Sequence, residues 1–269
     1  MPLRKALISV MLALAVTAVG HAPRAHAATI KPSEEALKAA GDKFDVALWD
    51  RLLHKYVDTK GRVDYARLRA TAADLAHLDR LYAQVGRQRL GALPDKSAQL
   101  AFLINAYNVC VWKNVLMRPP FKDLTSQAQQ QDFFGNTEFL IAGQPLNLNK
   151  LENEWIRERF KDPRIHMAVN CASGGCPQLP NEAFTPARLD KQLDREARKF
   201  CNEARNVQYD PATKTAQLSH IFDWYAKDFG DMALAFINKY RAPAEQIPAD
   251  AKIQYVEYDW HLNDMQLPR

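Results

Sequence analysis

One long apolar stretch, DKSAQLAFLINAYNVCVWKNVLMRPP at residues 95 to 120, restricts the fold of this chain more than any other feature. Asp95 or Ser97 is a typical N-cap of a helix, and the two prolines at residues 119 and 120 would end that helix. Because nearly all of its side chains are apolar, we expect the helix to be buried on most of its sides. The rest of the domain should therefore pack around it.

Two amide side chains interrupt this apolar helix. Asn105 and Asn108 lie three residues apart and so share a face. A buried amide left without partners costs roughly 1 to 3 kcal/mol, so each of them needs hydrogen bonds. The favoured interpretation is that they tie the helix to neighbouring loops, and the alternative is a direct contact with a substrate.

The first 27 residues have the pattern of a cleavable signal peptide. Arg4 and Lys5 precede an apolar run over residues 6 to 19, and Ala-His-Ala at residues 25 to 27 is a small-x-small cleavage site. The run is short for a bilayer span, and no later stretch approaches the ~20 apolar residues of a membrane helix. We expect a mature chain that begins near Ala28, is periplasmic or secreted, and has no membrane span.

Length and charge set further limits. About 240 residues follow the leader, and a single domain over residues 28–269 is the simplest interpretation. Removing the leader takes away three of the 36 basic residues and none of the 31 acidic ones, so the formal net charge falls from +5 to +2. This weak charge, without a basic run or a base-stacking motif, argues against nucleic-acid partners. Composition gives no indication of the oligomeric state.

The order of the expected elements indicates the fold class. Helical spacing dominates residues 33 to 90, whereas short strands appear only later. We predict a hairpin turning at Gly143-Gln144, a helix begun by Asn147 or Asn149, a strand over DPRIHMAVN at 162–170, a hairpin turning at Asp210-Pro211, helical spacing in SHIFDWYAKDFG at 219–230, and a final strand in KIQYVEYDWHLND at 252–264. This order predicts an α+β fold, a largely helical single domain with a small mixed or antiparallel sheet. A papain- or transglutaminase-like layout is one version of it.

Two of the four cysteines lie in the segment IHMAVNCASGGCPQLP at residues 165–180. A thiolate nucleophile is the first of three chemistries that fit this spacing, and Cys171 is the better candidate because it precedes a loop of small residues. The candidate bases are His166, His220 and His261, with Glu152, Asp223 or Asp259 to orient one of them. On a regular strand His166 and Cys171 would point to opposite faces, so they can meet only if the chain turns near Asn170.

A disulfide between Cys171 and Cys176 is the second chemistry, since the glycine-bearing loop permits the required approach and an oxidising compartment preserves the bond. A bridge between Cys110 and Cys201 is a further option. The third chemistry is a metal site using His166, Cys171 and Cys176, which ranks last because the spacing lacks the C-x₂-C grip of structural zinc sites. A redox role is disfavoured because C-x-x-C is absent. We predict no metal and no cofactor.

Five blocks occur in a recognisable order: GRVDY at 61–65, LAFLINAYNVCVWKNVL at 100–116, DPRIHMAVNCASGGCPQL at 162–179, LSHIFDWYAKDF at 218–229 and YDWHLN at 258–263. Together they resemble an exported bacterial member of the proteins that carry domain of unknown function 547. The resemblance implies that the family pattern includes His166, Cys171, Cys176, Asn105, Asn108 and Asp259. One departure matters: the family pattern has Ile-Glu-His where this chain has Leu151-Glu152-Asn153. Glu152 matches, but Asn153 could not replace a histidine base.

Two hypotheses follow. As a cysteine-dependent hydrolase or acyl transferase, Cys171 would attack an acyl carbon, His166 or His220 would move the proton with Glu152 as its partner, and an amide would hold the oxyanion. Asn105, Asn108 and Asn170 are the candidates for holding this small-molecule or peptide substrate. As a non-catalytic periplasmic binding or assembly protein, the chain would use the Cys171–Cys176 disulfide to staple a loop.

Overall fold

Helix α5, Lys96–Met117, runs through the middle of the structure, with Asp95 as its N-cap. The computed structural model describes residues 29–268, so the predicted signal peptide lies outside the described residues. By length and composition alone α5 could cross a membrane, although we expected no later stretch to come close. However, 89% of its most apolar 18-residue stretch is buried inside the protein. The core helix of a globular domain can have the same length and composition. The predicted burial of this helix is confirmed.

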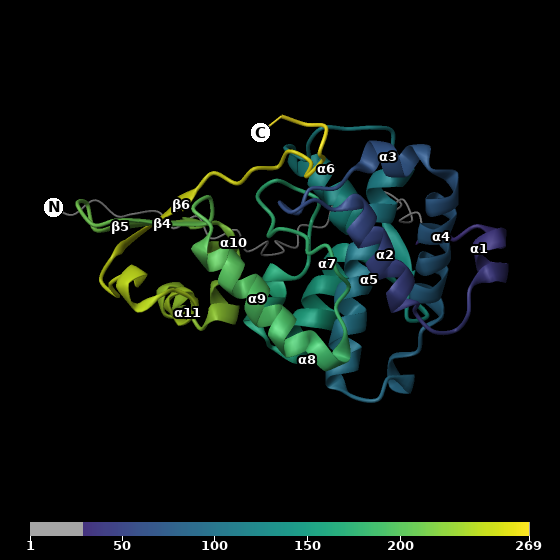
Figure 1. The fold of residues 1–269 in the computed structure, drawn as a ribbon, viewed down its shortest axis with the longest axis horizontal. Coiled ribbons are helices and arrows are strands. Elements are labelled where there is room, and N and C mark those ends of the chain that lie inside the picture. The colour runs from purple at the N-terminus through teal and green to yellow at the C-terminus, as the bar shows by residue number, and fades with distance from the viewer. Residues whose placement is uncertain (1–28, 269) are drawn as a thin grey trace, which may run out of the picture.

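The first third of the described chain forms a helical layer against α5, as predicted (Figure 1). Side chains of Ser33, Asp45 and Asp64 accept hydrogen bonds from the free amides at three of the helix starts. The indole rings of Trp49 and Trp112 meet edge to face at 4.9 Å and join this layer to α5. The elements are α1 (Glu34–Ala39), α2 (Val46–Tyr56), α3 (Tyr65–Ala70), α4 (Ala72–Arg87) and a 3₁₀ turn at Leu90–Ala92.

A small mixed sheet lies against this layer. Its strands are β1 (Thr29–Ile30), β2 (Glu138–Ile141) and β3 (Gln144–Asn147), with β1 parallel and β3 antiparallel to β2. The predicted hairpin is confirmed, but its turn is Ala142-Gly143, one residue earlier than expected. Both turn residues have positive φ, 49° and 81°, which suits a tight two-residue hairpin. Helix α6 (Gln127–Gln130) and a π-helical segment (Gln131–Asn136) precede β2.

One continuous helical segment follows the hairpin and carries Glu152. It begins as α7 (Leu148–Lys150), continues as a π-helix (Leu151–Arg157) and ends as α8 (Glu158–Phe160). Asn147 caps it by accepting a hydrogen bond from the Lys150 amide, so the predicted start at Asn147 is confirmed. A π-helical stretch widens the turn, and such stretches are frequent at functional sites.

The predicted strand over residues 162–170 is wrong. Pro163–Met167 form a short 3₁₀ helix instead, and the Asp162 carboxylate caps it by accepting a hydrogen bond from the Arg164 amide. Asp-Pro is a strong helix-start signal, because proline at the first position has no amide hydrogen to satisfy. The strand alternation that separated His166 from Cys171 therefore does not apply to this segment.

The remaining elements form a second group with its own apolar cluster, at the opposite end of the molecule from α1 (Figure 1). Strands β4, β5 and β6 form a mixed three-stranded sheet, in which β6 runs parallel to β5. Strands β4 and β5 make the predicted hairpin, but its turn is at residues 211–214 and Asp210 is still paired in β4. The predicted final strand is confirmed only over its first five residues. The elements are a 3₁₀ turn (Pro186–Arg188), α9 (Leu189–Asn202), β4 (Val207–Asp210), β5 (Thr215–Ser219), α10 (Ile221–Trp224), a 3₁₀ turn (Ala226–Phe229), α11 (Ala233–Tyr240), a 3₁₀ turn (Pro243–Glu245) and β6 (Lys252–Val256). The fold is the predicted α+β single domain.

Candidate functional site

A cavity of about 330 Å³ is lined by residues of two apolar clusters, the one around α5 and the one in the second group of elements. The cysteine segment forms part of its wall. Its aromatic lining consists of Tyr107, Phe134, Trp224, Tyr225, Tyr258 and Trp260. Its polar lining consists of Gln127, Gln130, Gln131, Asn149, Glu152 and His166. Apolar walls with a few converging polar groups are typical of small-molecule sites.

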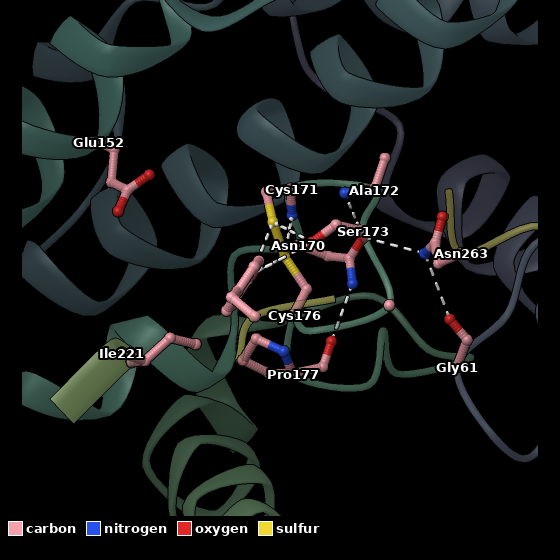
Figure 2. Close-up of a disulfide and its surroundings, with 12 residues drawn as sticks. Gly61, Glu152, Asn170, Cys171, Ala172, Ser173, Cys176, Pro177, Ile221 and Asn263 are labelled. Atoms are coloured by element: carbon pink, nitrogen blue, oxygen red, sulfur yellow. Dashed lines mark hydrogen bonds between the residues drawn. A yellow bond between two sulfur atoms is a disulfide. The ribbon is translucent and has the colours of Figure 1, made fainter. Parts of the chain in front are cut away.

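The cysteines in this wall are joined by a disulfide. Cys171 and Cys176 are bonded, with their Cα atoms 6.1 Å apart (Figure 2). This is the second chemistry that the sequence left open. Within residues 29–268, Cys110 and Cys201 are buried free thiols, so they do not form the further bridge we considered. Burial raises the pKa of both thiols, that of Cys201 to about 12, which keeps them protonated and unreactive.

The disulfide loop is docked on the C-terminal segment. The amides of Gly174 and Gly175 each donate a 2.7 Å hydrogen bond to that segment, to the carbonyls of His261 and Asp259. A Cβ atom on Gly175 would lie 2.8 Å from the ring of Tyr258, so the packing requires glycine at this position. The two glycines therefore allow the loop and the Tyr258 ring to lie in direct contact.

Asn170 organises the start of this loop (Figure 2). Its amide oxygen accepts hydrogen bonds from the Ala172 amide at 2.9 Å and from Asn263 at 3.1 Å. Its side-chain nitrogen donates to the Pro177 carbonyl at 2.8 Å. Its backbone amide donates to Asn108 at 2.9 Å. The chain turns here, as a meeting of His166 and Cys171 in one site requires.

The asparagines of α5 tie the helix to loops. Asn108 donates to the Ala168 carbonyl at 3.1 Å, and Asn105 exchanges two hydrogen bonds with the backbone of Phe184. Neither these two side chains nor Asn170 is among the described residues that line the cavity. The favoured interpretation accounts for their partners, and a substrate contact through them stays a prediction.

His166 is the histidine that the fold brings into the cavity wall. Its Nε2 atom donates to Asp228 Oδ2 at 2.6 Å, and its ring stacks on Tyr225 with 3.9 Å between the ring centroids. Its Nδ1 atom is buried without a partner among the described residues. Nδ1 is therefore the ring nitrogen of His166 that Asp228 does not engage.

Arg157 fixes Asp228 from the other side. Its guanidinium donates to both carboxylate oxygens, at 2.6 and 2.9 Å. Burial alone would raise the pKa of the Asp228 carboxyl, but the hydrogen bonds from His166 and Arg157 outweigh it and hold that pKa well below its usual range. Asp228 therefore stays ionised. We did not predict this role of Asp228 from the sequence. The sequence shows only that it is an acidic residue in the same block as His220.

Glu152 contributes the negative charge of the cavity. The residue is 9% exposed, and its Oε1 accepts a 2.7 Å hydrogen bond from the Tyr225 hydroxyl. Figure 2 shows Glu152 on a different segment from the disulfide, with its carboxylate turned toward the side on which the disulfide lies. Burial, together with the charge of Glu152, raises the pKa of Tyr107 and Tyr225 well above its usual value. Both phenols therefore remain hydrogen-bond donors.

The other two candidate histidines lie outside the described cavity lining. The His220 ring is stacked between Trp224 and Tyr255, with centroids 5.4 Å from each. His261 is exposed and pairs with Asp259 at 2.8 Å. Glu152, His166 and Cys171 are thus brought to one cavity, whereas His220 is not.

Three aromatic rings that the sequence analysis did not single out form one wall of the cavity. Trp224, Tyr258 and Trp260 pack on one another with centroids 4.7 to 6.0 Å apart. The Tyr258 hydroxyl lies 3.3 Å from the sulfurs of both Cys171 and Cys176. The aromatic content of the WYAKDF and YDWHLN blocks could have indicated these three residues in the sequence.

Comparison with known families supports the resemblance over part of the chain. Residues 92–201 match the family described as protein of unknown function, DUF547. This range contains α5, Glu152, His166 and both bonded cysteines, so the DUF547 match covers much of the site. Asp228 and the wall of Trp224, Tyr258 and Trp260 lie beyond it. No curated protein and no solved structure matches the chain.

Metal ligation was the third chemistry considered for this segment. Among residues 29–268, no three His, Cys, Asp or Glu side chains are grouped so that they could hold a metal ion. The sulfurs of Cys171 and Cys176 are used in the disulfide. The trio of His166, Cys171 and Cys176 therefore does not form such a group.

Proposed function

We propose that this is an exported protein that binds a small organic molecule, uncharged or positively charged, in the cavity beside the Cys171–Cys176 disulfide. The observation that carries the proposal is the disulfide itself. Cys171, the candidate nucleophile, is bonded to Cys176 in the cavity wall. A disulfide-bonded sulfur has no thiolate with which to attack an acyl carbon, so recognition rather than covalent catalysis suits this state.

The charge of the lining supports the proposed ligand class. Glu152 is the acidic side chain among the described lining residues, and no lysine or arginine accompanies it there. The neighbouring Arg157 is already occupied by Asp228 and by the face of Tyr225, 4.6 Å away. An anion placed beside Glu152 would be repelled and would find no cation to pair with.

The arrangement also suggests how a ligand would lie. Its apolar part would pack on the wall formed by Trp224, Tyr258 and Trp260. Its polar part would reach the side-chain amides of Gln130 and Asn149, or the carboxylate of Glu152, which also line the cavity. An apolar ring with one hydrogen-bonding group is the simplest molecule with this character.

A matched set of probes tests the proposal. Cyclohexylmethylamine, cyclohexylmethanol and cyclohexanecarboxylate share a ring and differ in charge, and saturation-transfer NMR on the oxidised protein reports their binding. We expect the amine and the alcohol to bind more tightly than the carboxylate. Trp224→Ala should weaken binding roughly two- to tenfold, and Glu152→Gln should weaken only the amine.

The control is Met232→Ala, since Met232 is 63% exposed and lies outside the described cavity lining. It should leave all three affinities unchanged. Absence of binding by every probe, or preference for the carboxylate, would contradict the proposal.

Thiol catalysis is a second candidate function, favoured by one observation. Cys171 lines the same cavity as His166, whose Nε2 is held by Asp228 and whose Nδ1 is free. After reduction, Cys171 could attack an acyl carbon while a histidine moves the proton. The test is hydrolysis of p-nitrophenyl acetate by the phosphine-reduced protein. The candidate fails if Cys171→Ala, correctly folded, hydrolyses the ester equally fast.

A further inference from the structure

We propose that the Cys171–Cys176 disulfide is a thiol–disulfide exchange centre, in which a small thiol without negative charge enters the cavity, attacks Cys171 Sγ and displaces Cys176 as the leaving thiolate. This activity goes beyond ligand binding, because it changes covalent bonds in the protein and in the thiol. Since the chain lacks C-x-x-C, the inference rests on the surroundings of the two sulfurs.

The two cysteines differ in exposure. Cys171 is partly exposed, whereas Cys176 is 4% exposed, and both line the cavity. A thiolate attacks a disulfide on the more accessible sulfur and pushes out the other sulfur in line with the new bond. The greater exposure of Cys171 therefore favours attack at its sulfur.

Cys176 is better placed to leave. Its sulfur accepts a hydrogen bond from the Cys171 backbone amide at 2.9 Å and faces the Tyr258 hydroxyl at 3.3 Å. Among the described residues, the Cys171 sulfur has hydroxyl partners alone, Ser173 at 3.1 Å and Tyr258 at 3.3 Å. A fixed amide donor favours the charged form of a thiol, and a stabilised thiolate departs faster.

The loop backbone around Cys176 is also held in place. Arg205 donates hydrogen bonds to the carbonyls of Gly174 and Cys176, the latter at 3.1 Å. The loop can therefore keep its position, and keep the amide aimed at Cys176, while the sulfur–sulfur bond is broken.

The reaction has two balanced steps. The thiolate forms a bond to Cys171 Sγ as the Cys171–Cys176 bond breaks, and the electron pair leaves on Cys176. In the resulting mixed disulfide, a second small thiolate attacks the sulfur that came from the first small thiol, and Cys171 is released as a thiolate. Two thiols become one small disulfide, the protein disulfide is reduced to a dithiol, and the thiol protons pass through solvent to the two cysteines. A small disulfide drives the same steps in reverse.

The test compares the oxidised protein in its native state with the same protein unfolded in concentrated urea. A disulfide that serves only as a staple is reduced more slowly in the native state, because the fold shields it. We expect cysteamine to reduce the native protein about tenfold faster, per thiolate, than the unfolded chain. Slower native reduction would overturn the proposal.

Single-cysteine variants identify the attacked sulfur. Cystamine should form a mixed disulfide with Cys176→Ser at Cys171 at least about tenfold faster than with Cys171→Ser at Cys176. The buried thiols of Cys110 and Cys201 give little background. Peptide mass mapping after alkylation locates the adduct. Faster reaction at Cys176 would contradict the assigned direction.

Tyr258→Phe should slow native reduction roughly two- to tenfold, and Tyr255→Phe, outside the described cavity lining, is its control. If Tyr258→Phe does not fold, the single-cysteine pair still decides.

Replacing cysteamine by 3-mercaptopropionate should also slow the reaction per thiolate, in the wild type but not in Glu152→Gln. Equal rates for both thiols in the wild type would contradict the charge selection. The cyclohexane probes report binding without any thiol, so a failure of exchange and a failure of the binding function are distinguished.

Discussion

The Nε2 atom of His166 lies 2.6 Å from Asp228 Oδ2, although the two residues are 62 positions apart in the chain. Arg157 holds the same carboxylate through two further hydrogen bonds. The three side chains come from the π-helical segment and two 3₁₀ turns, so their contact fixes these short elements to one another. It also fixes the orientation of the histidine ring that lines the cavity.

The first prediction concerns the pH dependence of stability. The pKa of Asp228 lies well below its usual value in the folded protein, so the unfolded chain binds this proton first as the pH falls. The stability from ionised Asp228 is complete above about pH 5, beyond the unfolded pKa near 4, and is lost as the pH falls toward the folded pKa. Asp228→Asn should cost about 1 to 3 kcal/mol at pH 7, and its disadvantage should shrink at pH 3. Urea unfolding at both pH values measures this.

Asp132→Asn is the matched control, because this carboxylate pairs with Arg118 at the surface and is 55% exposed. It should change the free energy of unfolding by less than about 1 kcal/mol. A disadvantage of Asp228→Asn that stays constant between pH 7 and pH 3 would show that the ionised pair does not stabilise the fold.

The second prediction concerns the disulfide as a staple. The two bonded cysteines are five positions apart. Closing so short a loop lowers the conformational entropy of the unfolded chain, which raises its free energy by about 2 kcal/mol. The double variant Cys171→Ser, Cys176→Ser should therefore lower the free energy of unfolding by about 2 kcal/mol. Urea denaturation of oxidised and phosphine-reduced wild type should give the same difference. Unchanged stability in both comparisons would mean that the bond does not constrain the unfolded state as expected.

The third prediction concerns Asn170. Truncation to alanine removes hydrogen bonds to the loop, to Asn263 and to Pro177 in a site that is 4% exposed. We expect a loss of about 2 to 4 kcal/mol in the free energy of unfolding, because several buried groups lose their partners. Asn136→Ala, at an exposed position, should cost less than about 0.5 kcal/mol. Similar values for the two variants would argue against this organising role.

Local sequence signals predicted much of the fold because they act over a few residues. Asp95 and Asn147, each one of two predicted caps, do cap helices, and both hairpins form, with their turns shifted slightly from the predicted residues. The segment around His166 was predicted incorrectly, because β-like alternation was given more weight than the Asp162-Pro163 helix start.

The site was predictable only in part. Glu152, His166 and Cys171 do line one cavity, but the partners of His166 and of the disulfide come from residues 228 and 258. No short-range pattern joins such distant positions, and only tertiary packing brings them together. His220 has aromatic and acidic neighbours in the sequence, which made it a candidate base beside His166, yet its ring is held in a separate aromatic stack.

The last prediction concerns the contact between the loop and Tyr258. A methyl group on Gly175 would lie 2.8 Å from the Tyr258 ring, too close for ordinary packing, so the ring must move away from the loop. Gly175→Ala should therefore cost about 1 to 3 kcal/mol. It should also weaken the contacts between the Tyr258 hydroxyl and the two sulfurs. Gly91→Ala is the matched control, since no atom lies within 4 Å of its Cβ position.

Urea denaturation measures the stability of both glycine variants. The tryptophan fluorescence of each variant reports whether the Tyr258 ring has moved. Trp224 and Trp260 lie with their ring centroids 4.8 and 4.7 Å from that of Tyr258, so a shift of the ring should change their emission. If Gly175→Ala matches Gly91→Ala in both measurements, then the loop tolerates a side chain at this position. The Tyr258 contact would then not depend on glycine, and the close packing would not explain how the hydroxyl is held against the disulfide.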